Sequence, residues 1–443
     1  MNIFKMRRNF ILFITFSLFI SHSYAKTDLN TTKKVRTFIS NNWGGTIKVT
    51  LKDSANLFGL PKPYSVPSVL GETAFKEMYY WDTYFTNLGL LLDHQVNQAQ
   101  NNTDDIIFMV NRFGKMLNGS NVAFLNRSQP PYLSMMVYDV YHVTNNKIWL
   151  KDAVKSLEKE YSFWMKERIT PCGLNRYSSA ASDDEKRGMA YAVQGRSNNP
   201  DLLKGLTDKQ ILVAGSHFTA EAESGWDFTP RFESRCEDFC PIDLNSNLYV
   251  YEKNFEFFYR QLGNNKKAEQ WKSIANKRRY LINKYFYDSK KGCFYDYDYV
   301  HKTHSSVLSA AIFSLMYAKA VNNEQAKKIV NALKLLETPF GLRTCEDKNY
   351  DRTYQWGSTN GWAPLHFIAA VGLENYKYHA ESSRIENKYI NMVNNNFLKT
   401  NNLWEKYNII DGTSNAASEY GTPALLGWTA GVYIYFTENR HKN

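Results

Sequence analysis

Residues 242–286 read IDLNSNLYVYEKNFEFFYRQLGNNKKAEQWKSIANKRRYLINKYF. Apolar side chains recur at helical spacing over 242–262 and again over 266–286. The turn Gly263-Asn264-Asn265 separates the two runs, and so short a polar connection lets two helices fold back on each other. The stretch therefore predicts an antiparallel helical hairpin.

The same pattern recurs along the rest of the chain. Further paired runs cover 81–98 with 104–117, 130–143 with 148–168, 305–320 with 324–335, and 362–371 with 376–398, and a last run covers 424–436. About twelve helices in antiparallel pairs indicate an all-α fold. We expect an α/α toroid, with an inner ring of helices inside an outer ring.

Long loops should gather at one end of this toroid, because short turns close the other end. The loops with the most informative residues are 70–84, 118–131, 173–235, 343–363 and 403–428. Catalytic residues concentrate in loops that a rigid scaffold positions. Residues 46–51 alternate like a strand, so we expect a β-hairpin or an irregular lead-in over 42–69.

The N-terminus has the pattern of a secretory signal. Lys5, Arg7 and Arg8 precede an apolar run over 10–20, and the small residues of Ser23-Tyr24-Ala25 follow. The run is too short to span a bilayer, so it predicts a signal peptide over 1–25 rather than a membrane anchor. Residues 26–443 contain no low-complexity linker and are predicted to form one domain, in a secreted or periplasmic protein.

Composition narrows the class of partner. The net charge of +11 is scattered over helices and comes with no nucleic-acid-binding motif, so it favours solubility over nucleic-acid binding. Five cysteines leave at least one unpaired; Cys236 and Cys240 could form a short disulfide, and their spacing lacks the second pair of a metal site. An aromatic content of 15% suits a carbohydrate cleft, although a large helical core uses the same residues.

Six segments mix carboxylates, amides or arginine with tryptophan and tyrosine, as a sugar site requires. Within 221–231, Asp227 lies between Trp226 and Phe228. Apolar neighbours raise a carboxyl pKa and suit a proton donor, whereas a helix-capping turn aspartate is the alternative. The segments are 75–88 FKEMYYWDTYFTNL, 124–133 FLNRSQPPYL, 221–231 EAESGWDFTPR, 354–365 YQWGSTNGWAPL, 403–409 LWEKYNI and 417–431 ASEYGTPALLGWTAG.

Taken in order, these segments resemble the α,α-trehalases of glycoside hydrolase family 37. YYWDTYF is similar to the end of that family's first signature and QW…NGWAPL to its second, while FLNRSQPP, ESGWDF and WEKYN match further typical stretches. The resemblance covers nearly the whole chain after the signal. It implies an (α/α)6 barrel and an inverting α-glycosidase for trehalose or a related small α-glucoside.

The resemblance also implies roles for individual residues. Asp227 corresponds to the general acid and Glu405 to the general base, and inversion requires two such carboxyls with space for a water between them. Lys406 follows Glu405 and would favour its ionised form. Glu419 corresponds to a pocket glutamate and is the alternative base.

Other residues match the family's substrate ligands: Trp81, Asp82, Asn118, Arg127, Gln129, Trp356 and Trp362. For the tryptophans, packing in the core is the alternative role. The expected partner is a small carbohydrate, bound by a monomer without metal or other cofactor. We expect no nucleic-acid partner and, once the signal is cleaved, no membrane association.

The chain departs from the family pattern at several ligand positions. Ala74 replaces the arginine of the first signature, and Gly357 replaces the aspartate after Gln-Trp. The glycine-rich run before SEYG reads 415–418 NAAS, and 178–193 contains no Arg-Pro-Glu stretch. These departures leave open a different α-linked disaccharide or glycoside as substrate. A non-catalytic sugar-binding protein and a phosphorylase are the alternatives from other classes.

Overall fold

The computed structural model describes residues 28–69, 74–197, 199–348, 350, 354–416 and 420–439. The predicted signal peptide over 1–25 and Glu419 lie outside these residues. Among the helices that are described, none combines the length and apolar character needed to span a membrane.

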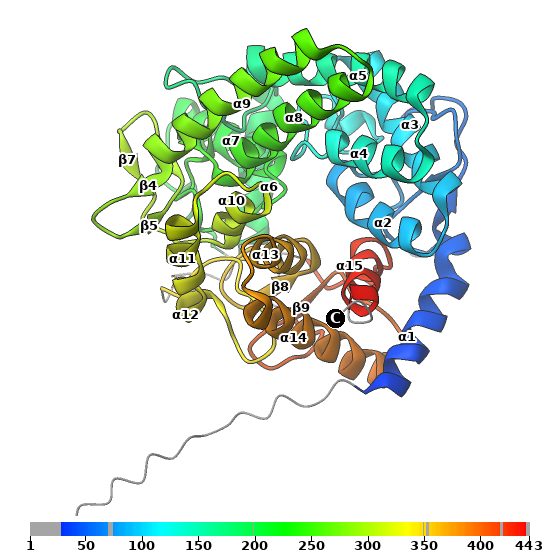
Figure 1. Ribbon diagram of the computed structural model, residues 1–443. Helices are drawn as coiled ribbons and strands as arrows, with labels where there is room; N and C mark the ends of the chain where they lie inside the picture. Colours follow the sequence, from blue (N-terminus) through cyan, green and yellow to red (C-terminus); the bar gives the residue numbers. More distant parts are fainter. Residues whose placement is uncertain are drawn as a thin grey trace, which may run out of the picture.

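Six helices of the described chain form a closed inner ring (Figure 1). Each contacts the next one around the ring, and the last contacts the first. The predicted all-α (α/α)6 barrel is therefore confirmed. The inner helices are α2 (Tyr80–Leu92), α4 (Leu133–Thr144), α8 (Ile242–Gln261), α10 (Phe313–Tyr317), α13 (Ala363–Asn375) and α15 (Gly427–Asn439).

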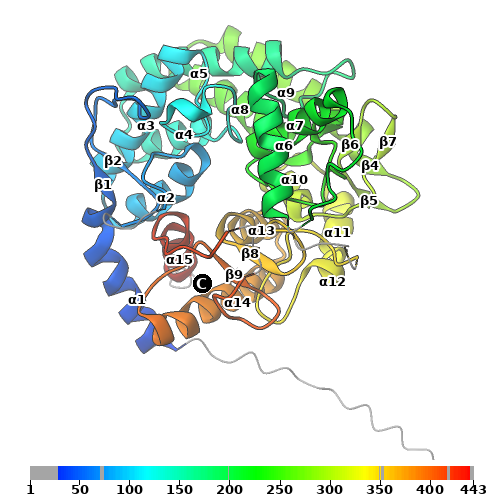
Figure 2. The same ribbon diagram turned by 180° about the vertical axis from the view of Figure 1, so that it is seen from behind.

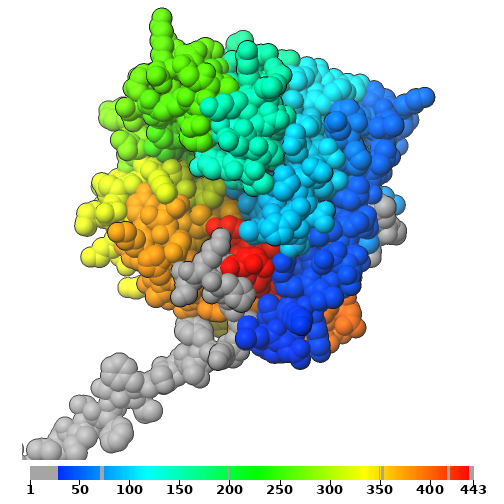
Figure 3. Space-filling model, turned by 45° about the vertical axis from the view of Figure 1, so that its right-hand side comes forward, coloured from blue at the N-terminus to red at the C-terminus, as the bar shows by residue number. Residues whose placement is uncertain are grey.

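An outer layer of helices surrounds this ring. The predicted hairpin over 242–286 forms as α8 and α9, and the side chain of Asn264 accepts a hydrogen bond from the Lys267 N–H to begin α9. Outer helices bury one face, whereas inner α13 is buried nearly all round, as its position requires. The outer helices are α1 (Leu29–Asn42), α3 (Val96–Phe113), α5 (Lys147–Glu167), α9 (Asn265–Phe286), α11 (Asn323–Asn331) with the short α12 (Leu333–Leu336), and α14 (His379–Thr400). Figure 3 shows the blue N-terminal segment beside the red C-terminal helix, where α1 contacts α15.

Several predicted boundaries were wrong. The run 81–98 is divided between α2 and α3 by a turn over 93–95, and 305–320 contains only the 3-10 turn η4 (Ala310–Ile312) and α10. Helix α1 was not predicted. The expected loop 173–235 contains two helices, α6 (Asp183–Arg196) and α7 (Asp208–Glu223), each of which begins with a capping box.

Helices α6 and α7 form a hairpin at one side of the barrel, drawn in green in Figure 2. The pair has a small apolar core of its own, which includes Phe228, the residue after Asp227. The helices cross closely at Gly215, where a Cβ atom would lie 1.9 Å from the carbonyl oxygen of Lys186. The expected long loop is therefore a helical flap.

Short antiparallel strands fill the loops. Strand β1 (Ile47–Lys48) pairs with β2 (Tyr64–Ser65), which agrees with the predicted lead-in hairpin. Strand β8 (Asn360–Trp362) pairs with β9 (Lys406–Asn408), and this register places Trp362 opposite Lys406. The others are β3 (Phe239–Cys240), β6 (Tyr297–Asp298) and β7 (Thr303–His304) in one sheet, and β4 (Tyr287–Asp288) with β5 (Cys293–Phe294).

Candidate active site

A cavity of about 720 Å³ opens among the loops and brings the predicted site residues together. Its wall includes both predicted catalytic carboxyls and every predicted ligand that the structure describes, while Glu419 lies outside the described residues. Ala74, where the resemblance implies an arginine, also lines it. The predicted residues in the wall are Trp81, Asp82, Asn118, Arg127, Gln129, Asp227, Trp356, Trp362 and Glu405.

Asp227 lies on a sharp turn after α7. Gly225 has a φ of 71° and Phe228 a φ of 63°, and a positive φ at an aromatic residue is uncommon and strained. Trp226 stacks on Trp356 with ring centroids 5.6 Å apart. Burial raises the pKa of Asp227, and the positive charge of Arg127 opposes that shift. The pKa of Asp227 is therefore raised, as a proton donor requires, and burial is the cause.

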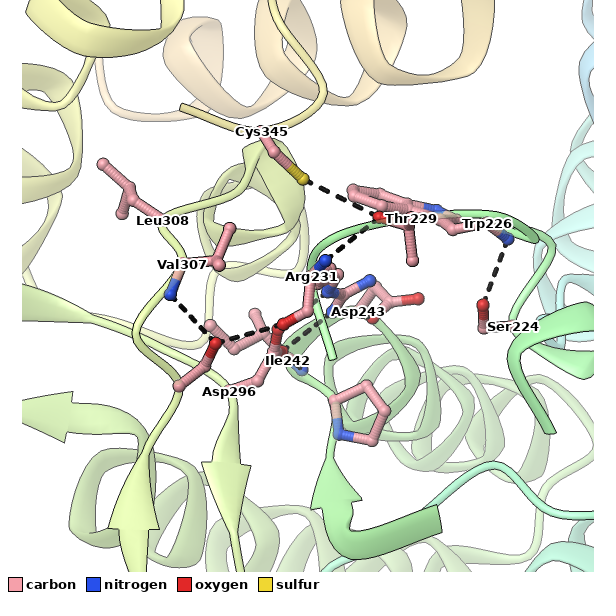
Figure 4. Close-up of polar contacts among 12 residues, drawn as sticks. Ser224, Trp226, Thr229, Arg231, Ile242, Asp243, Asp296, Val307, Leu308 and Cys345 are labelled. Carbon is pink, nitrogen blue, oxygen red and sulfur yellow. Dashed lines mark hydrogen bonds and ion pairs between the residues drawn. The ribbon is translucent and has the colours of Figure 1, made fainter. Parts of the chain in front are cut away.

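A buried ionic network holds this turn from below (Figure 4). The Nε of Arg231 donates to Asp296 at 2.7 Å, and its Nη2 donates to Asp243 at 2.5 Å. The same guanidinium lies 4.4 Å from the ring centroid of Trp226. Thr229 Oγ1 donates to the carbonyl of Trp356 at 3.1 Å, which joins the turn to the opposite loop.

Glu223 connects a second part of the wall to the same turn. Its carboxylate accepts from Arg168 Nε at 2.8 Å and from the backbone N–H groups of Ser128 and Ser178 at 2.9 and 2.8 Å. Glu223 and Arg168 are both buried, and removal of one partner from such a pair is costly. This network positions the segment that contains Arg127 against the Asp227 turn.

Glu405 lies just before β9 and is bonded on both carboxylate oxygens. Lys406 Nζ donates to Oε2 at 2.5 Å, and the Tyr420 hydroxyl donates to Oε1 at 2.7 Å. Burial raises the pKa of Glu405 and the negative charge of Asp227 adds to that, whereas the two donors favour the ionised form. Trp428 Nε1 also donates to the Glu405 carbonyl at 2.9 Å. The side chain is therefore fixed in one orientation.

Tryptophan rings form one side of the cavity. Trp356 stacks on Trp362 with centroids 3.8 Å apart, and Trp81 lies 5.5 Å from Trp356. Trp428 meets Trp81 and Trp362 edge-on at 5.8 and 5.9 Å. These rings belong to the core and also line the cavity, so packing in the core does not prevent contact with a ligand. Such a wall suits the apolar faces of a sugar.

Polar groups face the same space. Gln129 Oε1 accepts from the Trp81 N–H at 3.2 Å, and Asn118 Nδ2 donates to the Ala222 carbonyl at 3.4 Å. Arg127 lies over the Phe124 ring, 4.9 Å from its centroid. Within the described part of the chain, the buried Nε of Arg127 has no hydrogen-bond partner, which leaves a donor for a ligand hydroxyl.

Asp82 contributes a third carboxyl to the cavity. It lies in the first turn of α2 and is buried. Burial, followed by the negative charge of Glu405, raises the pKa of Asp82 to about 8. A carboxyl of this kind is protonated near neutral pH and can donate a hydrogen bond.

Several lining residues were not singled out from the sequence. Tyr420 and Trp428 occur within the quoted segment 417–431, so the mixture of aromatic and polar residues there was the available signal. Arg196, at the end of α6, also lines the cavity and lowers the pKa of Asp227 against the larger effect of burial. No motif marked Arg196, because the fold of the flap brings it to the cavity.

The two departures from the family pattern differ in their surroundings. Ala74 faces the cavity. A Cβ at Gly357 would lie 3.0 Å from the carbonyl oxygen of Tyr354, so an aspartate there would require a local shift of the chain.

One group of described side chains has a spacing that could hold a metal ion, namely Asp238, Asp298 and His301. Arg235 Nη1 already donates to Asp298 at 2.7 Å and to Asp238 at 3.0 Å. These residues do not belong to the cavity wall. The group is therefore an ion-pair cluster with its own cation.

The chain is similar in sequence to proteins named trehalases. A family model described as trehalase matches residues 21–440. The periplasmic trehalase of Escherichia coli O1:K1 / APEC is 30% identical over 405 residues, which cover 86% of this chain and 69% of the relative. The periplasmic trehalase of Shigella flexneri serotype 5b (strain 8401) matches with the same identity and coverage.

Solved structures agree with this placement. The neutral trehalase Nth1 from Saccharomyces cerevisiae superposes with a TM-score of 0.71 at 29% identity, over 85% of this chain and 73% of that one. A GH63 mannosylglycerate hydrolase from Thermus thermophilus, in complex with glucose, gives a TM-score of 0.60 at 13% identity over 92% and 99% of the two chains. The second likeness shows the shared fold alone.

Proposed function

The chain belongs to the trehalase family of glycoside hydrolases, and from this premise we propose that it is an exported inverting enzyme that hydrolyses trehalose. The observation that carries the proposal is the pair of carboxyls, Asp227 and Glu405, which line one cavity and have different partners. Inverting hydrolysis uses two carboxyls in opposite protonation states.

Asp227 is the general acid in this proposal. Its protonated carboxyl donates the proton to the glycosidic oxygen while the bond from that oxygen to the anomeric carbon breaks. Burial supports this role, because it disfavours the carboxylate and so keeps the carboxyl protonated before the reaction. The strained turn and the Arg231 network support it by fixing where the carboxyl lies.

Glu405 is the general base. Its carboxylate takes a proton from a water molecule whose oxygen attacks the anomeric carbon from the face opposite the leaving group. Lys406 and Tyr420 support this role, since both donate to the ionised carboxylate. Glu419 remains the alternative base.

The remaining wall residues bind the sugar. The tryptophan wall packs on the apolar ring faces, and Arg127, Asn118 and Gln129 bond the hydroxyl groups. Protonated Asp82 donates a further hydrogen bond. The relatives named as trehalases support trehalose as the substrate.

One observation favours a second candidate, a hydrolase for another small α-linked glycoside. Ala74 lines the cavity where the trehalase pattern has a charged donor. A substrate screen in which trehalose alone is cleaved would remove this candidate.

The reaction is tested by proton NMR of the first turnovers. Inversion at one glucose unit of trehalose should release equal amounts of β-glucose and α-glucose before mutarotation, without phosphate. Two α-glucose molecules would contradict inversion. Failure to cleave trehalose and other α-glucosides would support a sugar-binding protein, and a requirement for phosphate would indicate a phosphorylase.

The two catalytic roles are separated with α-glucosyl fluoride, whose leaving group needs little protonation. The kcat of Asp227→Asn should fall ~10²–10⁴-fold on trehalose but much less on the fluoride, whereas the kcat of Glu405→Gln should fall on both substrates. Equal losses by Asp227→Asn on the two substrates would refute the assignment of the acid.

Export is a separate part of the proposal. The basic and apolar start of the chain supports it, as do the relatives named periplasmic trehalases. Cell fractionation followed by N-terminal sequencing should find a mature protein that begins at Lys26. An intact N-terminus in the cytoplasmic fraction would contradict export.

A further inference from the structure

Two cysteines far apart in the sequence face each other outside the cavity. The sulfur atoms of Cys172 and Cys240 lie 3.7 Å apart, although 68 positions separate the residues. The hydroxyl oxygen of Thr170 lies 3.1 Å from Cys172 Sγ and 3.5 Å from Cys240 Sγ. The two thiols thus share the Thr170 hydroxyl as a polar neighbour.

The other described cysteines have different neighbours. Cys345 Sγ lies 3.8 Å from the Thr229 hydroxyl, and Cys293 Sγ faces the Lys328 carbonyl at 4.0 Å. No sulfur contact joins Cys236 to Cys240 in the described chain. The short disulfide between Cys236 and Cys240 that the sequence allowed is therefore not the pair that the fold brings together.

We propose that Cys172 and Cys240 form a disulfide when the protein meets a disulfide-bearing oxidant. The sulfur atoms must close from 3.7 Å to about 2.0 Å, a movement that rotation of the side chains and a small backbone adjustment can supply. This modification is independent of the proposed reaction, because neither cysteine lines the cavity.

The exchange proceeds in two balanced steps. The Cys172 thiolate attacks the oxidant's disulfide, forms a mixed disulfide and releases one oxidant thiolate. Cys240 then loses its proton, and its sulfur attacks Cys172 Sγ to release the second oxidant thiolate. The two cysteines lose two protons and two electrons, and the oxidant's disulfide is reduced to two thiols.

Cys172 is the better first nucleophile. It is half-buried, whereas Cys240 is fully buried. The hydrogen bond from Cys240 lowers the pKa of Cys172 to about 6, and burial raises the pKa of Cys240. A partly exposed thiol with a low pKa reacts first in thiol–disulfide exchange.

The disulfide would join two elements that support the active site. Cys172 lies in the turn closed by the bridge between Ile169 and Asn175, shortly before Ser178, which donates to Glu223. Cys240 ends β3 and leads into α8. The closed loop includes the α6–α7 flap and the Asp227 turn, so the bond would restrict the unfolded chain around the acid.

The test uses the purified full chain. It is reduced, equilibrated with a glutathione buffer rich in glutathione disulfide, quenched in acid, alkylated and digested for mass spectrometry. We expect one cross-linked peptide that joins Cys172 to Cys240, with the other three of the five cysteines alkylated. A peptide that joins Cys236 to Cys240, or five alkylated cysteines, would overturn the proposal.

Thermal unfolding provides a second measurement. A disulfide between cysteines 68 positions apart should raise the Tm of the oxidised wild type by about 5 °C over that of the reduced wild type. Cys236→Ser is the matched control and should keep this difference, whereas Cys172→Ser should abolish it. If Cys172→Ser does not fold, the wild-type peptide map still decides. Neither measurement involves a sugar, so a failed trehalose assay leaves the result intact.

Discussion

Replacement of Lys406 by methionine tests how Glu405 is kept ionised. The ammonium is fully buried and donates to Glu405 Oε2 at 2.5 Å, so it stabilises the carboxylate in a site where burial opposes ionisation. Methionine retains most of the length and apolar bulk of the side chain but removes the charge. The pKa of Glu405 should therefore rise further in Lys406→Met.

The size of the shift follows from the bond that is lost. A hydrogen bond to a charged group contributes about 1.5–3 kcal/mol, and one pKa unit corresponds to about 1.4 kcal/mol. The pKa of Glu405 should thus increase by about one to two units. The base works as a carboxylate, so the acidic limb of kcat/KM against pH should move to higher pH by the same amount.

The assay is glucose release over a pH series, with circular dichroism to confirm folding. Tyr420→Phe removes a neutral donor to the same carboxylate and should shift the limb less, by about 0.4–1 unit. An acidic limb that stays in place in folded Lys406→Met would refute the reasoning and assign the base role to Glu419. Movement of the alkaline limb alone would indicate that Lys406 acts on Asp227.

The pH dependence of stability should also change in Lys406→Met. Once Lys406 is gone, the folded pKa of Glu405 lies further above its unfolded value. Folding then favours protonated Glu405. The free energy of unfolding of Lys406→Met should therefore fall as the pH rises through the folded pKa of Glu405. Urea unfolding at several pH values checks this, and a loss of stability on acidification instead would contradict it.

Three further predictions concern other parts of the fold. Ala74→Arg should raise kcat/KM for trehalose by about ten- to a hundredfold, because a cavity-facing arginine adds a charge-assisted bond. Steady-state kinetics tests this, and a lower kcat/KM in the variant would contradict it. Arg196→Ala should raise KM about tenfold, with a smaller rise in Arg196→Lys, and an unchanged KM would remove Arg196 from the binding site. Gly431→Ala should cost about 1–3 kcal/mol in urea unfolding, since its Cβ would lie 1.9 Å from the Phe85 carbonyl oxygen. Gly188→Ala, in open space within α6, should instead raise the free energy of unfolding slightly.

The toroid could be predicted from the sequence because its helices carry local signals. The run 242–286 shows both the helical period and the polar turn, and it folds as that hairpin. The flap was missed for a local reason as well. Gly188, Gly195 and Gly215 interrupt α6 and α7, and α6 buries few apolar residues, so periodicity was weak while the capping boxes at Ser182 and Thr207 were present.

Only those residues of the candidate site that lie in sequence motifs could be predicted. Asp227 and Glu405 are marked by their neighbours in sequence, and the cavity contains both. The position of Arg196 depends on how the flap packs on the Asp227 turn, which no local pattern encodes. The pairing of Cys172 with Cys240 likewise depends on contacts between distant segments.

Different parts of the fold hold the centre and the rim of the cavity. Buried ion pairs between Arg231 and Asp296 and between Arg168 and Glu223 hold the Asp227 turn. Substitutions in these pairs should lower kcat and stability together, since an unpaired buried charge is costly.

The residues at the rim of the cavity are less buried than those near the Asp227 turn. Ala74 is half-buried, and Arg196 is exposed. A change at the rim removes little buried contact, so it can alter which sugar binds without loss of the acid–base pair. Ala74, where the resemblance to trehalases implies an arginine, lies in this part of the cavity. We therefore expect Ala74→Arg to change KM while Tm stays nearly the same. A clear fall in Tm in this variant would show that the rim also supports the fold.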